Sequence, residues 1–104
     1  MIPYNKREGK IWYNSDLVDW QEAKLHVLSH GLHYGSFVFE GLRVYGGDIF
    51  KLEEHIERLF HSAKIMDIKI PYSKDEINTA TKKIVSVQNV QNGYVRPLLG
   101  EEVK

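Results

Sequence analysis

Residues 29–41 read Ser-His-Gly-Leu-His-Tyr-Gly-Ser-Phe-Val-Phe-Glu-Gly. Gly31 and Gly35 interrupt the first half, which is predicted to form a loop or a single turn. From Phe37 to Tyr45 the residues alternate as in a β-strand, so that side chains two positions apart share a face. One face is predicted to carry Phe39, Gly41 and Arg43, and the other Val38, Glu40, Leu42 and Val44.

The segments around this strand show alternating strand and turn patterns. Before it, we expect short strands at 10–14 and 17–20, joined by the turn residues Asn14-Ser15-Asp16. After it, Gly46-Gly47-Asp48 has hairpin-turn chemistry and leads into a short strand at 49–51. A last strand is predicted at 94–99.

Two helices are predicted between these strands. The first spans 52–66 and has an apolar stripe at Leu52, Ile56, Leu59, Ala63 and Met66. The second begins at the capping box Ser73-Lys74-Asp75-Glu76 and is predicted to bury Ile77, Ala80, Ile84 and Val87. This order of elements predicts an α+β fold, a two-layer sandwich of a mostly antiparallel sheet and two helices. At 104 residues we expect one domain, residues 1–104.

Composition excludes several classes of function. The formal net charge is zero and the basic residues are scattered, which argues against nucleic acid or an anionic membrane surface as a partner. The chain has no cysteine, so disulfides and thiolate chemistry are excluded. No apolar run approaches the roughly 20 residues of a membrane span, and the N-terminus lacks a signal-peptide core. A cytoplasmic protein is the expected result.

Several side chains have both a structural and a functional interpretation. Arg58 lies beside the apolar stripe of its helix, where its stem covers the core or its guanidinium binds a phosphate. Tyr94 and Arg96 share a strand face, either as a pair facing water or as a carboxylate receptor. Phe39 and Gly41 share another face, where the glycine marks either a bulge beside a core phenylalanine or a point of close approach to the backbone.

The histidines allow one further alternative. His26, His30 and His33 are spaced to share one helical face as metal ligands. Gly31 and Gly35 argue against a continuous helix there, and no His-Glu-x-x-His pattern is present. We therefore predict no metal site and expect histidines that brace the loop through hydrogen bonds. The sequence gives no partner for His55 or His61.

The stretch at 29–41, His-Ile-Glu-Arg-Leu at 55–59 and Tyr-Val-Arg-Pro-Leu at 94–98 together resemble the N-terminal domain of branched-chain amino acid aminotransferases, class IV pyridoxal-phosphate enzymes. This resemblance extends from about Lys10 to Leu99. It implies that Arg58 binds the phosphate of pyridoxal 5'-phosphate. It further implies substrate-binding roles for five residues: Tyr34, Phe39, Gly41, Tyr94 and Arg96.

The resemblance assigns these five residues different tasks. Tyr94 would contact the substrate α-carboxylate, and Arg96 the second carboxylate of glutamate or 2-oxoglutarate. Phe39 and Gly41 would form the wall and floor of the pocket for an aliphatic side chain of leucine, isoleucine or valine. Tyr34 would enter the active site of the neighbouring subunit, which implies a homodimer.

The resemblance also implies that something is missing. The family's Schiff-base lysine comes from a C-terminal domain, and no lysine here occupies a matching motif, so no catalytic residue is assigned. We therefore expect an N-terminal portion that is inactive alone, does not bind the cofactor by itself and requires a separate chain with the lysine domain. Two alternatives stay open: a non-catalytic, self-associating remnant domain, and a small histidine-based metal-binding protein.

Overall fold

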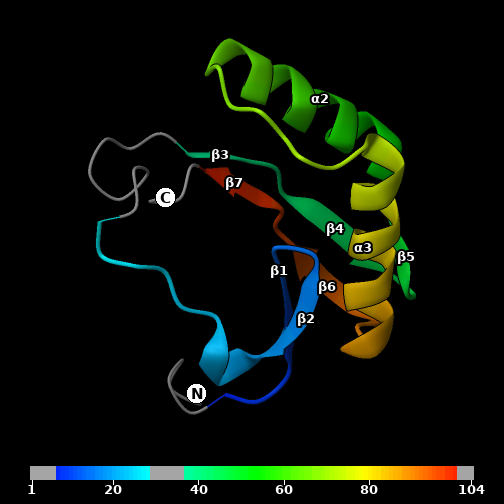
Figure 1. Cartoon of the computed structure of the whole chain (residues 1–104). Helices are drawn as coiled ribbons and strands as arrows, with labels where there is room; N and C mark the ends of the chain where they lie inside the picture. The colour runs from blue at the N-terminus through cyan, green and yellow to red at the C-terminus, as the bar shows by residue number, and fades with distance from the viewer. Residues whose placement is uncertain (1–6, 29–36, 101–104) are drawn as a thin grey trace.

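The computed structural model describes residues 7–28 and 37–100, and within them the fold is α+β, as predicted. Figure 1 shows helices α2 and α3 beside a set of antiparallel strands. In chain order the elements are β1 (Lys10–Tyr13), β2 (Asp16–Asp19), the short 3-10 helix η2 (Trp20–Glu22), β3 (Phe37–Phe39), β4 (Leu42–Tyr45), β5 (Asp48–Ile49), α2 (Leu52–Ile65), α3 (Lys74–Val87), β6 (Asn92–Val95) and β7 (Leu98–Gly100).

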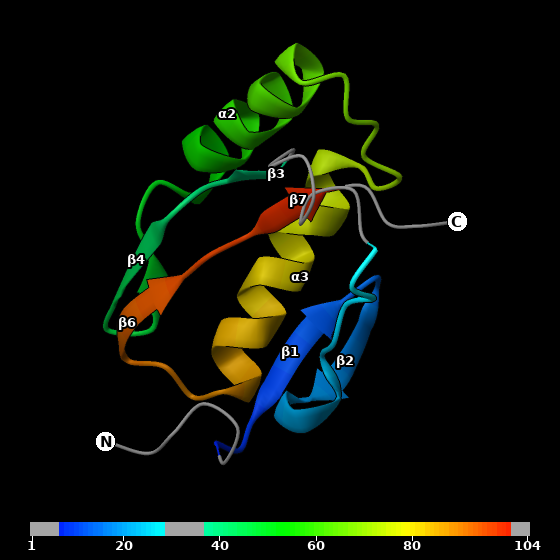
Figure 2. The same cartoon turned by 90° about the vertical axis from the view of Figure 1, so that its left-hand side faces the viewer.

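Strands β1 and β2 form a hairpin whose turn follows directly from its residues. Asn14 and Ser15 have φ values of 48° and 70°. Two successive residues in this region form the type I′ turn that suits the right-handed twist of a hairpin. The predicted second strand extended to Trp20, but Trp20 instead begins η2. The hairpin packs against α3 through β1 (Figure 2).

A long antiparallel ribbon organises the rest of the molecule. Its first arm is β3 and β4, and its second arm is β6 and β7, which run alongside in the opposite direction (Figure 2). Phe39 pairs with Leu98, and Leu42 pairs with Val95. The regular strand structure is interrupted in both arms at the same place, since residues 40–41 of the first arm lie opposite residues 96–97 of the second. Each predicted long strand, 37–45 and 94–99, is therefore two short ones.

Proline explains why the pairing is interrupted at this point. Pro97 has no N–H to donate, so the ladder cannot continue through it. A single bond crosses the break, in which the Glu40 N–H donates to the Pro97 carbonyl oxygen over 3.1 Å. The register is thus maintained through the break, and the alternation of faces predicted from Phe37 to Tyr45 is confirmed.

One face of the ribbon is buried and the other is open. Val38, Leu42 and Val44 are buried, and the core continues into α2 through Ile56 and Leu59. Leu42 and Leu59 are completely inaccessible to solvent. The open face carries the alternate side chains of the same strands. Phe39 and Tyr94 are among them, and each is about half exposed. Helix α2 packs against β3 and α3.

The helices confirm most of the predicted stripes and correct the rest. Helix α2 buries Leu52, Ile56, Leu59 and Ala63, but Met66 lies past its end and is exposed. Helix α3 begins with the predicted capping box between Ser73 and Glu76. Its buried residues are Ile77, Thr81 and Val85. Of the other predicted residues, Ala80 and Ile84 are half-buried and Val87 is exposed, so the buried stripe is shifted by one position. No helix among the described residues is long and apolar enough to cross a membrane.

Candidate functional site

The open face of the ribbon brings together four of the predicted substrate-binding residues. Phe39 ends β3, Tyr94 lies in β6, and Gly41 and Arg96 lie in the two breaks between strands. In the ribbon register, Gly41 is diagonal to Tyr94 and Phe39 is diagonal to Arg96. Diagonal neighbours on one face of an antiparallel pair are within reach of aromatic and long side chains. Tyr34, the fifth residue, lies outside the described residues.

The close approach predicted at Gly41 is made by the Tyr94 side chain. A Cβ atom at position 41 would lie 2.0 Å from the Tyr94 hydroxyl oxygen and 2.7 Å from its Cζ atom. No real side chain tolerates such distances, so glycine is required for the tyrosine to lie over the backbone. The absence of a side chain at position 41 thus leaves room for the phenol on the open face.

Arg96 and Phe39 form the second contact on this face. The Arg96 Cζ atom lies 4.8 Å from the centroid of the Phe39 ring, within the range of a cation–π interaction. Phe39 is 53% exposed, so the alternative of a core phenylalanine is wrong. An aromatic surface, a guanidinium and a phenol thus lie side by side, which suits a ligand that is part apolar and part carboxylate.

Arg58 lies apart from this face, on helix α2, and binds Glu40. Its Nε and Nη2 atoms donate to the two Glu40 carboxylate oxygens, each over 2.8 Å. The Arg58 side chain is 67% exposed, whereas that of Glu40 is 6% exposed. The stem-covering and the phosphate-binding interpretations both left out this ion pair. Among the described residues, no hydrogen bond or ion pair joins Arg58 to Tyr94 or Arg96.

His55 completes the cluster around Glu40. Its Nδ1 atom lies 2.8 Å from Glu40 Oε1, so the histidine for which the sequence offered no partner has one. The hydrogen bond from Arg58 lowers the pKa of Glu40 below its ordinary value, and His55 lowers it further, against the opposing effect of burial. Glu40 in turn raises the pKa of Arg58. The carboxylate is therefore ionised at neutral pH.

Sequence reasoning missed Glu40 and His55 as members of the site. The signal was present: Glu40 falls on the same strand face as Val38 and Leu42, and a buried carboxylate needs charged or hydrogen-bonding partners. His55 and Arg58 are three positions apart and therefore neighbours on one helix. The Phe-Val-Phe-Glu-Gly and His-Ile-Glu-Arg-Leu motifs thus meet at one carboxylate.

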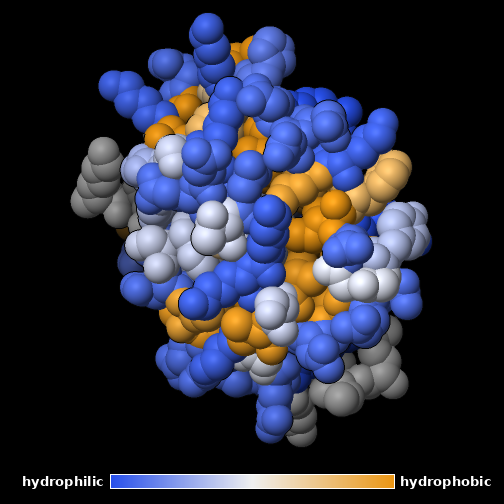
Figure 3. Space-filling view, turned by 90° about the vertical axis from the view of Figure 1, so that its right-hand side faces the viewer, coloured by the Kyte–Doolittle hydropathy of each residue, from blue (hydrophilic) through white to orange (hydrophobic). Residues whose placement is uncertain are grey.

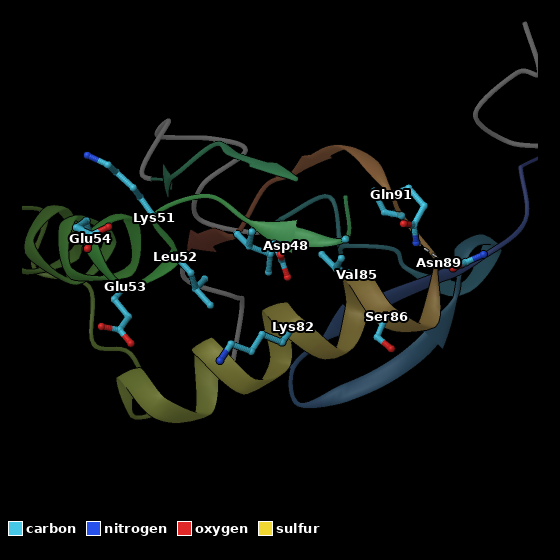
Figure 4. Close-up of a pocket in the computed structure, with 13 residues that line it drawn as sticks. Asp48, Lys51, Leu52, Glu53, Glu54, Lys82, Val85, Ser86, Asn89 and Gln91 are labelled. Atoms are coloured by element: carbon cyan, nitrogen blue, oxygen red, sulfur yellow. Dashed lines mark hydrogen bonds between the residues drawn. The ribbon is translucent and has the colours of Figure 1, made fainter. Parts of the chain in front are cut away.

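A surface pocket of about 730 Å³ lies elsewhere, between the β4–β5 turn, the start of α2 and the end of α3 (Figure 4). The side of the molecule that carries α3 and β5 shows apolar side chains among hydrophilic ones (Figure 3). Asp48, Lys51, Glu53 and Lys82 contribute to the pocket lining, which includes none of the predicted site residues. Of the predicted site residues, Phe39 and Tyr94 are each about half exposed. His30 and His33 lie outside the described residues, so the proposed histidine cluster is not tested.

The sequence is similar to known proteins of one family. Residues 37–102 match the family model described as amino-transferase class IV. The chain is 52% identical over 97 residues to the branched-chain-amino-acid aminotransferase of Pseudomonas aeruginosa, covering 89% of this chain and 32% of that one. The chain therefore spans about a third of the length of the curated relatives it matches.

Solved structures show the same relationship. The branched-chain amino acid aminotransferase from Escherichia coli superposes with a TM-score of 0.88 and 39% identity, over 92% of this chain and 34% of that one. The branched-chain aminotransferase from the thermophilic archaeon Thermoproteus uzoniensis, solved with norvaline, gives 0.85 and 38%, over 90% and 33%. Because the family model covers more than half of the sequence, this chain belongs to the class IV aminotransferase family.

Proposed function

We propose that this chain supplies the phosphate- and carboxylate-binding residues of a pyridoxal-phosphate-dependent aminotransferase that transfers an amino group between leucine, isoleucine or valine and 2-oxoglutarate. The observation that carries the proposal is the grouping of Phe39, Gly41, Tyr94 and Arg96 on one open face. The similar proteins support it, since their names state branched-chain aminotransferase activity. Residues 1–104 act as one domain in this proposal, and a cytoplasmic location is part of it.

The substrate contacts follow from the chemistry of that face. Tyr94 offers a neutral donor to the α-carboxylate, and Arg96 offers a charged fork to a second carboxylate. Phe39 presents apolar surface to an aliphatic side chain. Together they explain how one surface accepts both an aliphatic and an acidic substrate. Tyr34 of a second copy would complete the pocket, which makes a homodimer part of the proposal.

The residues present also fit the cofactor. Arg58 is well exposed and, among the described residues, bonds only to Glu40, which leaves N–H donors available to a phosphate. The bound cofactor would supply an electron sink for the negative charge that develops at the substrate α-carbon. The lysine that the reaction requires would come from outside this chain, as the family resemblance implies. Alone, the chain would therefore show no turnover of leucine with 2-oxoglutarate.

A graft tests the proposal. The chain would replace the matching segment of the Pseudomonas aeruginosa relative, and the hybrid would be assayed with leucine and 2-oxoglutarate. We expect turnover, and we expect Arg96→Met to raise KM for 2-oxoglutarate while leaving KM for leucine nearly unchanged. Arg43→Met is the matched control, because Arg43 lies on the same open face and pairs with Tyr94 in the register. A properly folded but inactive hybrid would contradict the proposal.

A second candidate function is a non-catalytic domain that self-associates. The open face favours it, because Phe39, Tyr94 and Leu98 are each more than half exposed and clustered apolar surface of this kind promotes association. Both candidates predict self-association, so turnover by the hybrid distinguishes them, and light scattering on the isolated chain tests which face associates. Association that persists when Phe39→Ser removes the central aromatic surface would argue against this face as the contact.

A further inference from the structure

Glu40 is the buried charged side chain of the described part of the molecule. The strand forces it there, because the period of two that buries Val38 and Leu42 also turns residue 40 inward. A carboxylate in that position requires full pairing. It obtains three hydrogen bonds of 2.8 Å, two from Arg58 and one from His55. The cluster is thus a fully paired carboxylate beneath an exposed guanidinium.

The pairing uses one particular edge of the guanidinium. Nε and Nη2 donate to Glu40, and these two atoms form the inner edge of the group, the edge that includes Nε, the nitrogen bonded to the stem. The outer edge, made of Nη1 and the remaining N–H of Nη2, has no acceptor among the described residues. That edge offers two parallel N–H donors, the arrangement that matches two oxygens of a phosphate.

We propose that Glu40 is the positioning residue for Arg58, clamping the inner edge of the guanidinium so that its outer edge is presented as a preformed phosphate fork. His55 supports the clamp by bonding to Glu40 Oε1. The inference rests on the proposed function, because it takes Arg58 as the ligand of the cofactor phosphate. It adds a task for the glutamate of the Phe-Val-Phe-Glu-Gly motif, which would act through Arg58.

A clamp of this kind acts by preorganisation. An arginine free to sample its rotamers must be ordered when the phosphate binds, whereas a clamped one is already in place. We expect loss of the clamp to weaken phosphate binding about two- to tenfold, the factor that corresponds to ordering one flexible side chain. Replacing Glu40 by a neutral residue also removes a negative charge near an anion site, which opposes this effect. A variant that keeps the charge is therefore the informative one.

Glu40→Asp is that variant, because the carboxylate retreats by about one C–C bond, roughly 1.5 Å, and no longer reaches both nitrogens. The probe is pyridoxamine 5'-phosphate, titrated by calorimetry into the hybrid that carries this chain in the Pseudomonas aeruginosa relative, with pyridoxamine as the phosphate-free comparison. Glu57→Asp is the matched control: Glu57 is also on α2 but bonds at the surface to Lys74. We expect weaker binding only for Glu40→Asp and for Arg58→Met.

A second readout does not depend on binding. In wild-type protein the Arg58 Nε–H should give an exchange-protected NMR signal shifted by its carboxylate partner, and Glu40→Asp should abolish it while Glu57→Asp preserves it. Absence of that signal in the wild type would overturn the proposal. Unchanged affinity in Glu40→Asp, with loss in Arg58→Met, would overturn the clamp but leave Arg58 as the phosphate ligand. Unchanged affinity in Arg58→Met, or wild-type binding no tighter than that of pyridoxamine, would overturn the assigned role of Arg58 and the clamp with it.

Discussion

Replacing Gly41 by alanine tests how the open face is built. A Cβ atom at this position would lie 2.0 Å from the Tyr94 hydroxyl oxygen, 2.7 Å from Cζ and 3.0 Å from Cε2. Atoms in contact normally lie about 3.5–4.0 Å apart. The hydroxyl end of the ring, 2.0 Å from the added Cβ atom, must therefore move by more than about 1 Å. Tyr94 is 52% exposed and has solvent to move into. The tyrosine should therefore yield, and the backbone should remain in place.

The expected change in stability is small for that reason. Displacing a half-exposed ring loses some packing energy. Against this loss, alanine lowers the conformational entropy of the unfolded chain, which adds about 0.4–1 kcal/mol to the free energy of unfolding. We expect the free energy of unfolding to change by less than about 1 kcal/mol, the usual range for substitutions outside the core. The functional effect should be larger, because a misplacement of about 1 Å in a positioning group costs up to about a hundredfold in rate. Urea denaturation of the isolated chain and kcat/KM of the grafted enzyme measure the two effects.

A double-mutant cycle with Tyr94→Ala identifies the partner. In the Tyr94→Ala background the added methyl group meets no ring, so Gly41→Ala should have almost no further effect on kcat/KM. The free-energy effects of two substitutions add when the sites are independent, whereas substitutions of contacting residues show an interaction free energy. A loss of several kcal/mol in unfolding free energy, equal in both backgrounds, would refute the reasoning, because it would place the strain in the backbone.

Three further predictions concern stability. Leu59→Ala should lower the free energy of unfolding by about 2–5 kcal/mol in urea denaturation, because Leu59 is fully buried; a change below 1 kcal/mol, roughly a surface effect, would contradict the assigned core. Ser73→Ala should lower it by about 1 kcal/mol, since the serine caps α3 by accepting from the Glu76 N–H over 3.1 Å, and Ser73→Asp should restore most of the loss. The lowered pKa of Glu40 means that its stabilising effect is complete above the ordinary glutamate value of about 4.3 and is lost as the pH falls through the folded-state value. Glu40→Gln should therefore flatten the acid side of the stability profile, measured as the free energy of unfolding in urea at a series of pH values.

Local patterns were sufficient where one physical preference dominated. The alternation from Phe37 to Tyr45 predicted which side chains share a face, because the side-chain period of a strand is local. The capping box at Ser73 was predicted because its two hydrogen bonds are local. The breaks in the ribbon were not predicted, since they depend on Pro97 lying opposite Glu40, which is a long-range pairing.

The second helix shows why a correct element carried a wrong buried face. Apolar residues fit two neighbouring stripes, and the prediction chose the one containing Ala80 and Ile84. The structure buries Thr81 instead, because its hydroxyl donates to the Ile77 carbonyl oxygen over 2.7 Å. Burying a polar side chain costs little free energy when the side chain makes its hydrogen bond to a backbone carbonyl of its own helix. Counting hydrophobic residues alone cannot reveal this.

Strand β3 and the break that follows it at residues 40–41 link the two parts of the proposed site. Phe39 and Gly41 face the open surface, whereas Glu40 between them faces α2 and its Arg58. Because the side-chain period of a strand is two, a slip of one residue in the β3–β7 pairing would exchange these faces and lose both groups at once. The Glu40–Pro97 backbone bond opposes that slip at the point where the regular ladder is interrupted. In the proposed function, the spacing between a phosphate on Arg58 and a carboxylate on Tyr94 or Arg96 would therefore depend on strand register.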